Sequence, residues 1–212
     1  PKDIYTEGIE KIDAQDIQYA KDWGYDVKLL GIAKKIGKEL DLRVHPTLIP
    51  SRNILASVKY EDNAILIKGD MVGETLFYGK GAGSLPTASS VVSDIVDIAK
   101  SVDDFKKAKN PSTFEFDSGV KKVREINDLL IRYYLRFSAI DKPGVLSDIS
   151  KILAGNKISI STVSQKERKQ GQPVPLVMLT HEANEGSMKK ALNKITKLPS
   201  ITKKPVMIRI ER

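Results

Sequence analysis

Six segments follow one another between Ile131 and Ile210, and in each the apolar residues have the spacing of either a strand or a helix. These segments constrain the fold more than any other feature of the sequence. Short apolar or period-two runs predict strands, and apolar residues at helical spacing predict helices. The expected elements are strand 131–140, helix 143–154, strand 158–165, strand 174–181, helix 184–197 and strand 206–210. This βαββαβ order, in about 80 residues, is typical of a ferredoxin-like split βαβ unit.

The residues ahead of this unit predict a mixture of strands and helices. Asp13 can cap a helix, Asp16 completes a short capping box, and Gly24 ends the helix. Ser84 can cap a later helix, and Pro86 suits its first turn. The expected elements are strands 26–36, 40–44, 63–69 and 74–78, an extended segment at 47–49, and a helix at 86–100.

We therefore expect an α/β protein of the α+β kind in three parts. A partial mixed sheet with helices occupies residues 1–100, a charged and partly helical linker residues 101–130, and a ferredoxin-like domain residues 131–212. The chain contains no cysteine, which excludes disulfides, a thiolate nucleophile and Cys-based metal sites. No metal site is expected.

The net charge of +8 raises the question of nucleic acid. Much of the excess lies in pairs such as Lys189-Lys190 and Lys203-Lys204, which are interleaved with acids and lack the aromatic residues of a base-stacking surface. This pattern favours a solvated lysine-rich face over a phosphate-tracking stripe. No run of about 18 apolar residues and no export signal is found, so we expect no membrane association and a cytoplasmic location.

The segment Asp141-Lys-Pro-Gly-Val-Leu146 joins the first strand of the βαββαβ unit to its first helix. Pro143 can fix φ at the first helical position, Asp141 can cap, and Gly144 permits close approach to the free amides of the helix N-terminus. Those amides favour a carboxylate, although the same residues also fit an ordinary well-capped helix. Gln165 can donate to a carboxylate and accept from an ammonium group, or it can simply end an edge strand.

The two histidines carry weaker signals. His45 could act as a general base, but its motif contains no paired carboxylate or nucleophile, which favours a hydrogen-bonded structural histidine. His181 stands alone at a strand end without a set of metal ligands, so a structural role is expected there too.

Three segments of the C-terminal part together resemble the ACT domain that ends many homoserine dehydrogenases: YLRFSAIDKPGVL from Tyr134, KISISTVSQ from Lys157 and VPLVMLTHE from Val174. The resemblance implies pairing with a second ACT domain and an amino acid bound between the first strand–helix turn of one copy and the second strand of another. Threonine is the implied effector, and a homo-oligomer is the implied assembly. The implied ligand-binding residues are Asp141, Gly144, Val145, Ser159, Ser161 and Gln165.

The first hundred residues resemble the catalytic segment of the same family, with TEGIEKI at Thr6, RVHPTLIP at Arg43 and GKGAGSLPTASSVVSD at Gly79. The glycine loop alone is a weak signal, because the full dinucleotide fingerprint requires GxGxxG in a βαβ unit. The resemblance implies contact with the nicotinamide end of NAD or NADP in the complete enzyme, without tight binding to this chain. The implied cofactor-binding residues are Gly79, Gly81, Ala82, Gly83 and Thr87.

Two descriptions of the chain follow. In the first it is the C-terminal part of a homoserine dehydrogenase, which interconverts homoserine and aspartate semialdehyde. That family's nucleotide-binding domain, acidic residue and lysine are then expected upstream of Pro1, so no catalytic residue is assigned here and the chain alone is expected to be inactive. In the second it is a non-catalytic amino-acid sensor that oligomerises through its ACT domain.

Overall fold

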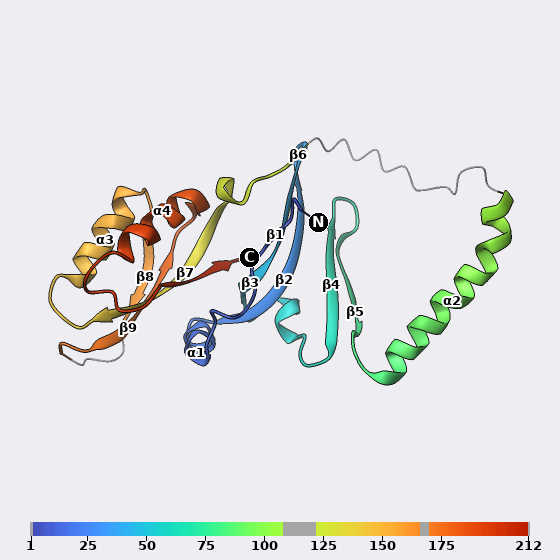
Figure 1. Ribbon diagram of the computed structural model, residues 1–212, viewed down its shortest axis with the longest axis horizontal. Helices are drawn as coiled ribbons and strands as arrows, with labels where there is room; N and C mark the ends of the chain where they lie inside the picture. Colours follow the sequence, from blue (N-terminus) through green and yellow to red (C-terminus); the bar gives the residue numbers. More distant parts are fainter. Residues whose placement is uncertain (1, 108–121, 166–169, 212) are drawn as a thin grey trace. The chain divides into compact units, whose positions relative to one another are not determined.

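The computed structural model describes residues 2–107, 122–165 and 170–211 (Figure 1). These residues form two compact units, 2–52 with 122–211, and 53–107. The middle of the predicted linker, with Asn110, and the part of the predicted polar break at 166–169 lie outside the described residues.

The C-terminal half of the first unit has the predicted βαββαβ topology. Its elements are β7 (Leu130–Ile140), α3 (Val145–Gly155), β8 (Ile160–Ser164), β9 (Pro173–Thr180), the short β10 (Ala183–Asn184), α4 (Glu185–Ile195) and β11 (Val206–Ile210). The strands pair in the antiparallel order β11-β7-β9-β8. Helices α3 and α4 cover one face of this sheet (Figure 1), so the predicted ferredoxin-like domain is confirmed.

The N-terminal half of this unit is built around one long hairpin. Its elements are β1 (Tyr5–Thr6), α1 (Ala14–Asp22), β2 (Tyr25–Ile36), β3 (Glu39–Pro50), and, beyond residue 121, β6 (Lys122–Val123) and the 3-10 helix η2 (Ile126–Asp128). Asp13 caps α1 in a capping box with Asp16, as predicted. The predicted strands 26–36 and 40–44 form the β2–β3 hairpin, which is paired from Tyr25 opposite Pro50 to Ile36 opposite Glu39.

Strand β3 connects the hairpin to the ferredoxin-like sheet. One edge of β3 pairs with β2 along its whole length. The other edge pairs in parallel with β6 at Glu39, with β1 at Arg43 and with β11 at Thr47 and Leu48. The sheet of the C-terminal half therefore continues without a break into residues 39–50.

Alternate residues of β7 enter two different cores. Tyr133, Leu135 and Phe137 pack under α3 and α4, and each is fully buried. Tyr134 faces the opposite side, where it packs with residues of α1, β3, β9 and β11. Both faces of the sheet are therefore covered at β7, which fits the eight apolar or aromatic residues among its eleven.

A buried arginine joins strand β11 to α4 and to the N-terminal residues. Arg209 is 1% exposed, and it donates from Nε and Nη2 to the Glu185 carboxylate (3.0 and 2.5 Å) and from Nη1 to Glu7 Oε2 (2.9 Å). The Tyr133 hydroxyl also donates to Glu185 (2.9 Å). Burial raises the pKa of the Glu7 carboxyl, but hydrogen bonds from Arg209 and Lys11 outweigh it and lower that pKa to about 2.

A second buried ionic cluster holds α1 against β7. Asp16 is fully buried, and its carboxylate accepts from Arg136 Nε (2.6 Å), Arg136 Nη2 (2.9 Å) and the Tyr134 hydroxyl (2.9 Å). Asp13 accepts a further bond from Arg136 Nη2 (2.6 Å). The residue that completes the helix cap therefore also fixes the helix to the sheet.

His45 lies on β3 next to the Arg43 guanidinium and is fully buried. Arg43 Nη1 lies 2.9 Å from His45 Nε2, and because a guanidinium can only donate, Nε2 must accept. Nδ1 then carries the proton and donates to Pro46 O (2.9 Å). Burial, with the Arg209 and Arg43 charges, lowers the pKa of His45 to about 4 despite the Pro46 bond. These contacts favour the structural role over the general base.

The second unit consists of the 3-10 helix η1 (Ile54–Ser57), the predicted hairpin β4 (Asp62–Gly69) and β5 (Gly73–Lys80), and helix α2 (Ser84–Lys107). Apolar side chains of the hairpin and of α2 are exposed, among them Ile65, Phe77, Leu85, Ile95 and Ile98. Among the described residues of the second unit, no further element covers these side chains.

Four predicted details of the helix ends are wrong. Ser84 does not precede α2 as a cap but is its first residue, and α2 extends past the predicted end at Lys100 to Lys107. Pro143 is not the first helical residue of α3, because Gly144 takes the N-cap position in a left-handed conformation (φ 93°) and the helix starts at Val145. No side chain caps α3, so Asp141 does not have the predicted capping role.

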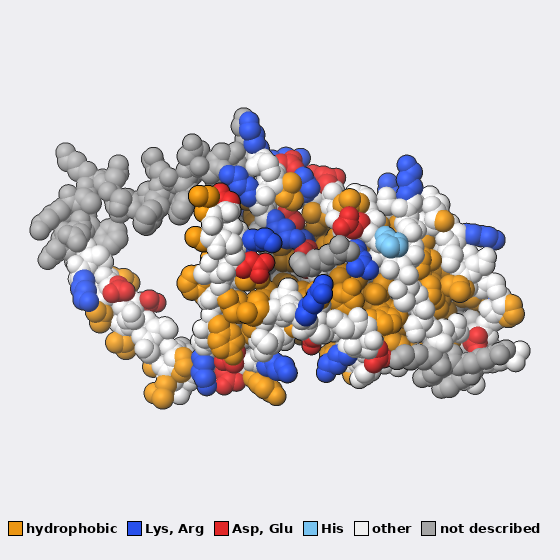
Figure 2. Space-filling view, turned by 180° about the vertical axis from the view of Figure 1, so that it is seen from behind, with side chains coloured by type: hydrophobic (Ala, Val, Ile, Leu, Met, Phe, Trp, Pro, Cys, Tyr) orange, Lys and Arg blue, Asp and Glu red, His pale blue; other side chains and the backbone are white. Residues whose placement is uncertain are grey.

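The surface bears on the charge and membrane predictions. On the face seen in Figure 2, Lys and Arg side chains are scattered among Asp and Glu rather than gathered into one stripe. No helix in the described part of the chain is long and apolar enough to cross a membrane. The preference for a solvated lysine-rich face stays a prediction.

Replacing Asp16 with Ala should lower the free energy of unfolding by about 3–5 kcal/mol, because it leaves the Arg136 and Tyr134 donors without their buried acceptor. Urea denaturation of the full 212-residue chain, followed by circular dichroism, measures the change. Asp3→Ala removes the same group from an exposed turn and should change stability by less than about 0.5 kcal/mol. Coincident curves for the two variants would contradict the assigned role of Asp16.

The lowered pKa of His45 makes stability depend on pH. The unfolded chain binds a proton at His45 below about pH 6.5 and the folded chain only near pH 4, so stability is fully present above pH 6.5 and falls as the pH is lowered. Between pH 7 and pH 5 the loss should be about 2 kcal/mol. Urea denaturation between pH 7 and 5 should show this slope in the unaltered chain and in His181→Gln, but not in His45→Gln. A slope that survives in His45→Gln would refute the assignment.

Candidate functional site

A cavity of about 190 Å³ lies beside the turn between β7 and α3. Four of the six predicted ligand-binding residues line it, namely Asp141, Gly144, Val145 and Gln165. The rest of the lining comes from the same turn, from the end of β7 and from Val174 and Leu176 of β9. The cavity therefore combines polar groups at the turn with an apolar floor from the sheet.

The backbone of the turn is held at both ends. Asp141 N donates to Gln172 O (2.9 Å), and Asp141 O accepts from Gly171 N (2.9 Å). Gly144 O accepts the first helical bond, from Asp148 N (2.9 Å). A left-handed φ at position 144 strains any residue with a Cβ, so the backbone conformation favours glycine there.

Gln165 approaches the turn from the end of β8. Its Nε2 atom lies 3.4 Å from Asp141 Oδ1, so the two polar side chains meet within one chain. Amides at a helix N-terminus favour a carboxylate, whereas Asp141 and the Gln165 carbonyl can accept from an ammonium group. The arrangement suits a small ligand with both charges.

Ser159 and Ser161 do not line this cavity. Both are exposed: Ser159 O accepts from His181 N (2.9 Å), and Ser161 lies where the register of β8 shifts against β9. Strand β8 is the edge of its sheet, so in a single chain these serines are presented outward, away from the predicted partners at the turn.

The five predicted cofactor-binding residues lie together in the second unit. Gly79 is the last residue but one of β5, and Gly81, Ala82 and Gly83 lie between β5 and α2. Thr87 N donates to Gly83 O (3.1 Å) in the first turn of α2. A Cβ at position 81 would overlap the amide of the exposed Asn63 side chain, so a larger residue there would require that side chain to move. The loop is exposed, and its strand belongs to a two-stranded antiparallel hairpin rather than to a βαβ unit. These residues fit contact with one end of a dinucleotide, not a complete cradle.

No group of His, Cys, Asp or Glu suited to a metal ion is found among the residues that the structure describes. Sequence reasoning also missed a second cavity, which is formed by four separate segments of the first unit. Lys142 and Leu146 also line the first cavity, although they were not predicted to do so. Their position in the turn motif near Gly144 was the sequence signal that could have identified them.

Both parts of the chain have counterparts in known families. Residues 1–96 match the family model of homoserine dehydrogenase, and residues 133–200 match that of the ACT domain. Curated homoserine dehydrogenases from Neisseria gonorrhoeae and Helicobacter pylori are each 43% identical to the chain, over 98% and 99% of its length. The matches cover 48% of each relative, so the chain spans about half the length of the curated relatives it matches.

A solved structure agrees with these relatives. The crystal structure of a homoserine dehydrogenase from Thiobacillus denitrificans superposes with a TM-score of 0.83 at 41% identity, covering 99% of this chain and 48% of that one. The turn, the cavity and the glycine loop thus lie in a chain whose sequence and fold both match the same enzyme family. The chain belongs to the homoserine dehydrogenase family and contains an ACT domain.

Proposed function

We propose that the chain is the C-terminal part of an enzyme that interconverts L-homoserine and L-aspartate 4-semialdehyde with NAD or NADP, in threonine and methionine biosynthesis. Family membership and the coverage of about half of each relative support this proposal. In this proposal the acidic residue and the lysine that serve substrate binding and proton transfer belong to a part of the parent enzyme outside these 212 residues. The 212 residues alone are accordingly expected to lack activity.

In this proposal the 212-residue chain contributes to catalysis by contacting the cofactor. Gly79, Gly81, Ala82, Gly83 and Thr87 would meet its nicotinamide end. The bound nicotinamide supplies hydride transfer to and from the substrate carbon. The exposed glycine turn at the start of α2 lets backbone approach closely, and the α2 N-terminus offers amides without helical partners.

The ACT domain is the regulatory and assembly module in this proposal, and its cavity takes an amino acid, with threonine the first candidate. The observation that carries this assignment is the meeting of Asp141 and Gln165 beside the free amides that follow Gly144. The ligand carboxylate binds at the α3 N-terminus, and its ammonium group binds at the two side chains. A short aliphatic side chain fits against Val174 and Leu176.

Assembly uses the same domain. Ser161 of edge strand β8 and Ser159 just before this strand offer hydroxyl groups to a second copy. Ligand binding regulates the enzyme when it stabilises one assembly state more than another, because a ligand shifts an equilibrium only by its difference in affinity. If the chain binds an amino acid but the full-length protein shows no hydride transfer, the description as a non-catalytic amino-acid sensor applies instead.

Calorimetry on the 212-residue chain with threonine, isoleucine, methionine and lysine tests the regulatory site. Threonine should bind most tightly, and Asp141→Asn should weaken it roughly tenfold by removing one charge-assisted bond. Asp128→Asn makes the same change at an exposed position and should leave the affinity unaltered. Absence of heat with all four amino acids would sink the proposal, as would equal affinity in the Asp141 variant.

The parent activity has its own test. The full-length protein that contains this sequence should reduce NAD or NADP when given L-homoserine, whereas the 212-residue chain should not. Aspartate supplied in place of homoserine serves as the control, because it has no alcohol to oxidise. A full-length protein without homoserine-dependent reduction of either cofactor would overturn the assignment.

A further inference from the structure

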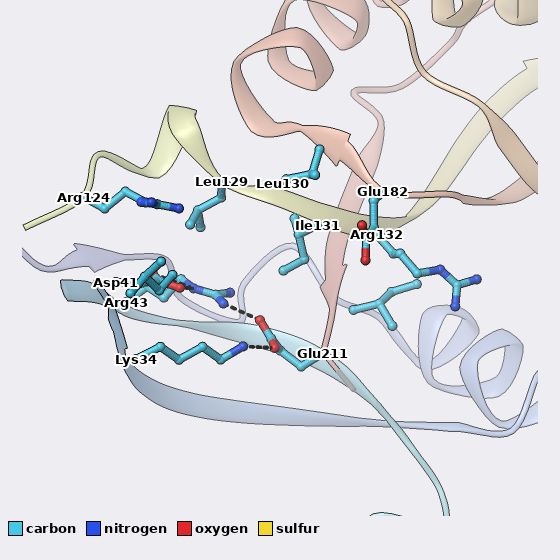
Figure 3. A pocket seen from close by; sticks show the side chains of 12 residues that line it. Lys34, Asp41, Arg43, Arg124, Leu129, Leu130, Ile131, Arg132, Glu182 and Glu211 are labelled. Atoms are coloured by element: carbon cyan, nitrogen blue, oxygen red, sulfur yellow. Dashed lines mark hydrogen bonds and ion pairs between the residues drawn. The ribbon is translucent and has the colours of Figure 1, made fainter. Parts of the chain in front are cut away.

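The second cavity, of about 290 Å³, lies in the first unit where the β2–β3 hairpin meets the ACT strands (Figure 3). Its walls come from the hairpin, from Arg124 and the start of β7, from Glu182 between β9 and β10, and from the end of β11. Ligand pockets in proteins start at about 300 Å³ for drug-sized molecules, so this volume suits a smaller metabolite. The turn at Gly144 contributes nothing to it.

One wall of the cavity is charged but internally neutralised. Lys34 Nζ lies 2.5 Å from Glu211, whose other oxygen bonds Arg43 (Figure 3). Arg43 Nε also pairs with Asp41 (3.0 Å), and Arg124 pairs with Glu39 outside the lining (3.0 Å). These groups make a polar, preorganised surface without a net demand for a counterion.

Two charged residues that line the cavity, Arg132 and Glu182, differ from that wall in having no ionic partner within the described residues. Arg132 Nε donates to Thr180 O (3.2 Å), which fixes the side chain and leaves the two terminal nitrogens for other acceptors. Figure 3 shows both residues at the end of the cavity away from Arg124, with the Arg132 guanidinium directed away from the other labelled side chains.

Aliphatic side chains supply the rest of the lining. Ile36 comes from the hairpin, Leu129, Leu130 and Ile131 from the segment entering β7, and Ile210 from β11. A ligand that complements the whole cavity carries a carboxylate for a guanidinium, an ammonium group for a carboxylate, and a short apolar side chain. That combination is the chemistry of an aliphatic α-amino acid.

We propose that this cavity is a second amino-acid site, distinct from the one beside Gly144, in which Arg132 holds the carboxylate, Glu182 the ammonium group and the aliphatic residues the side chain. The site joins β2–β3 to β7 and β11, so its ligand contacts both the ACT strands and the hairpin that precedes them. Occupancy therefore stabilises the junction of the two parts, whatever binds at the turn.

Methyl NMR on the 212-residue chain separates the two sites in one titration. L-isoleucine should shift the methyl signals of Ile36, Ile131 and Ile210, whereas binding at the turn is reported by Val145 and Leu146. Two single-charge analogues, 2-methylbutylamine and 3-methylvalerate, each lack one recognised group. Each should bind at the second cavity at least about tenfold more weakly than isoleucine.

Glu182→Gln is the matched variant, because Glu182 is exposed and the change keeps its shape. It should weaken the isoleucine affinity reported by the methyl signals of Ile36, Ile131 and Ile210 about tenfold. The affinity reported by Val145 and Leu146 should not change. Glu10→Gln, which removes an exposed carboxylate elsewhere, should change neither set. Shifts confined to Val145 and Leu146 would refute the second site while supporting the first. Equal binding of the single-charge analogues in the unaltered chain would refute zwitterion recognition.

Discussion

The ion pair between Arg209 and Glu185 is the interaction on which the first unit depends. It places a full positive charge 1% exposed in the middle of the sheet, and only several well-aligned acceptors can offset the cost of removing that charge from water. Glu7 and the Tyr5 hydroxyl supply the remaining partners from the N-terminal end of the chain. Strand β11 therefore needs residues of α4 on one side and of β1 on the other, which makes the ACT strands and residues 2–52 one structure.

Elements with a strong local signal were predictable from the sequence. The period of the apolar residues predicted the βαββαβ order, and Asp13 with Asp16 predicted the start of α1, because strands, helices and caps depend on residues close together in the chain. The turn at Asp141 was recognised for the same reason. Its cap was mispredicted because Gly144 adopts a left-handed φ, a conformation that sequence permits but does not require.

Long-range burial was not predictable in this way. Asp41, Arg43 and His45 alternate on β3 as a solvent-facing polar side would, yet all three are buried in the folded chain. Their partners lie far away in sequence, as Glu211 does for Arg43, and a charged residue in a strand carries no sign of which distant residue will neutralise it. The second cavity escaped prediction for the same reason, since no two of its walls are adjacent in the chain.

A sheet shared between the ACT strands and the β2–β3 hairpin gives ligand binding a direct physical route to the rest of the protein. Both cavities border strand β7, and β11 links that strand to β3. Native-state hydrogen exchange tests this shared sheet most directly. The account predicts that the amides of β3 and β7 open with the same free energy, as one cooperative unit. Amides of β3 that exchange at a much lower free energy while those of β7 stay protected would contradict it.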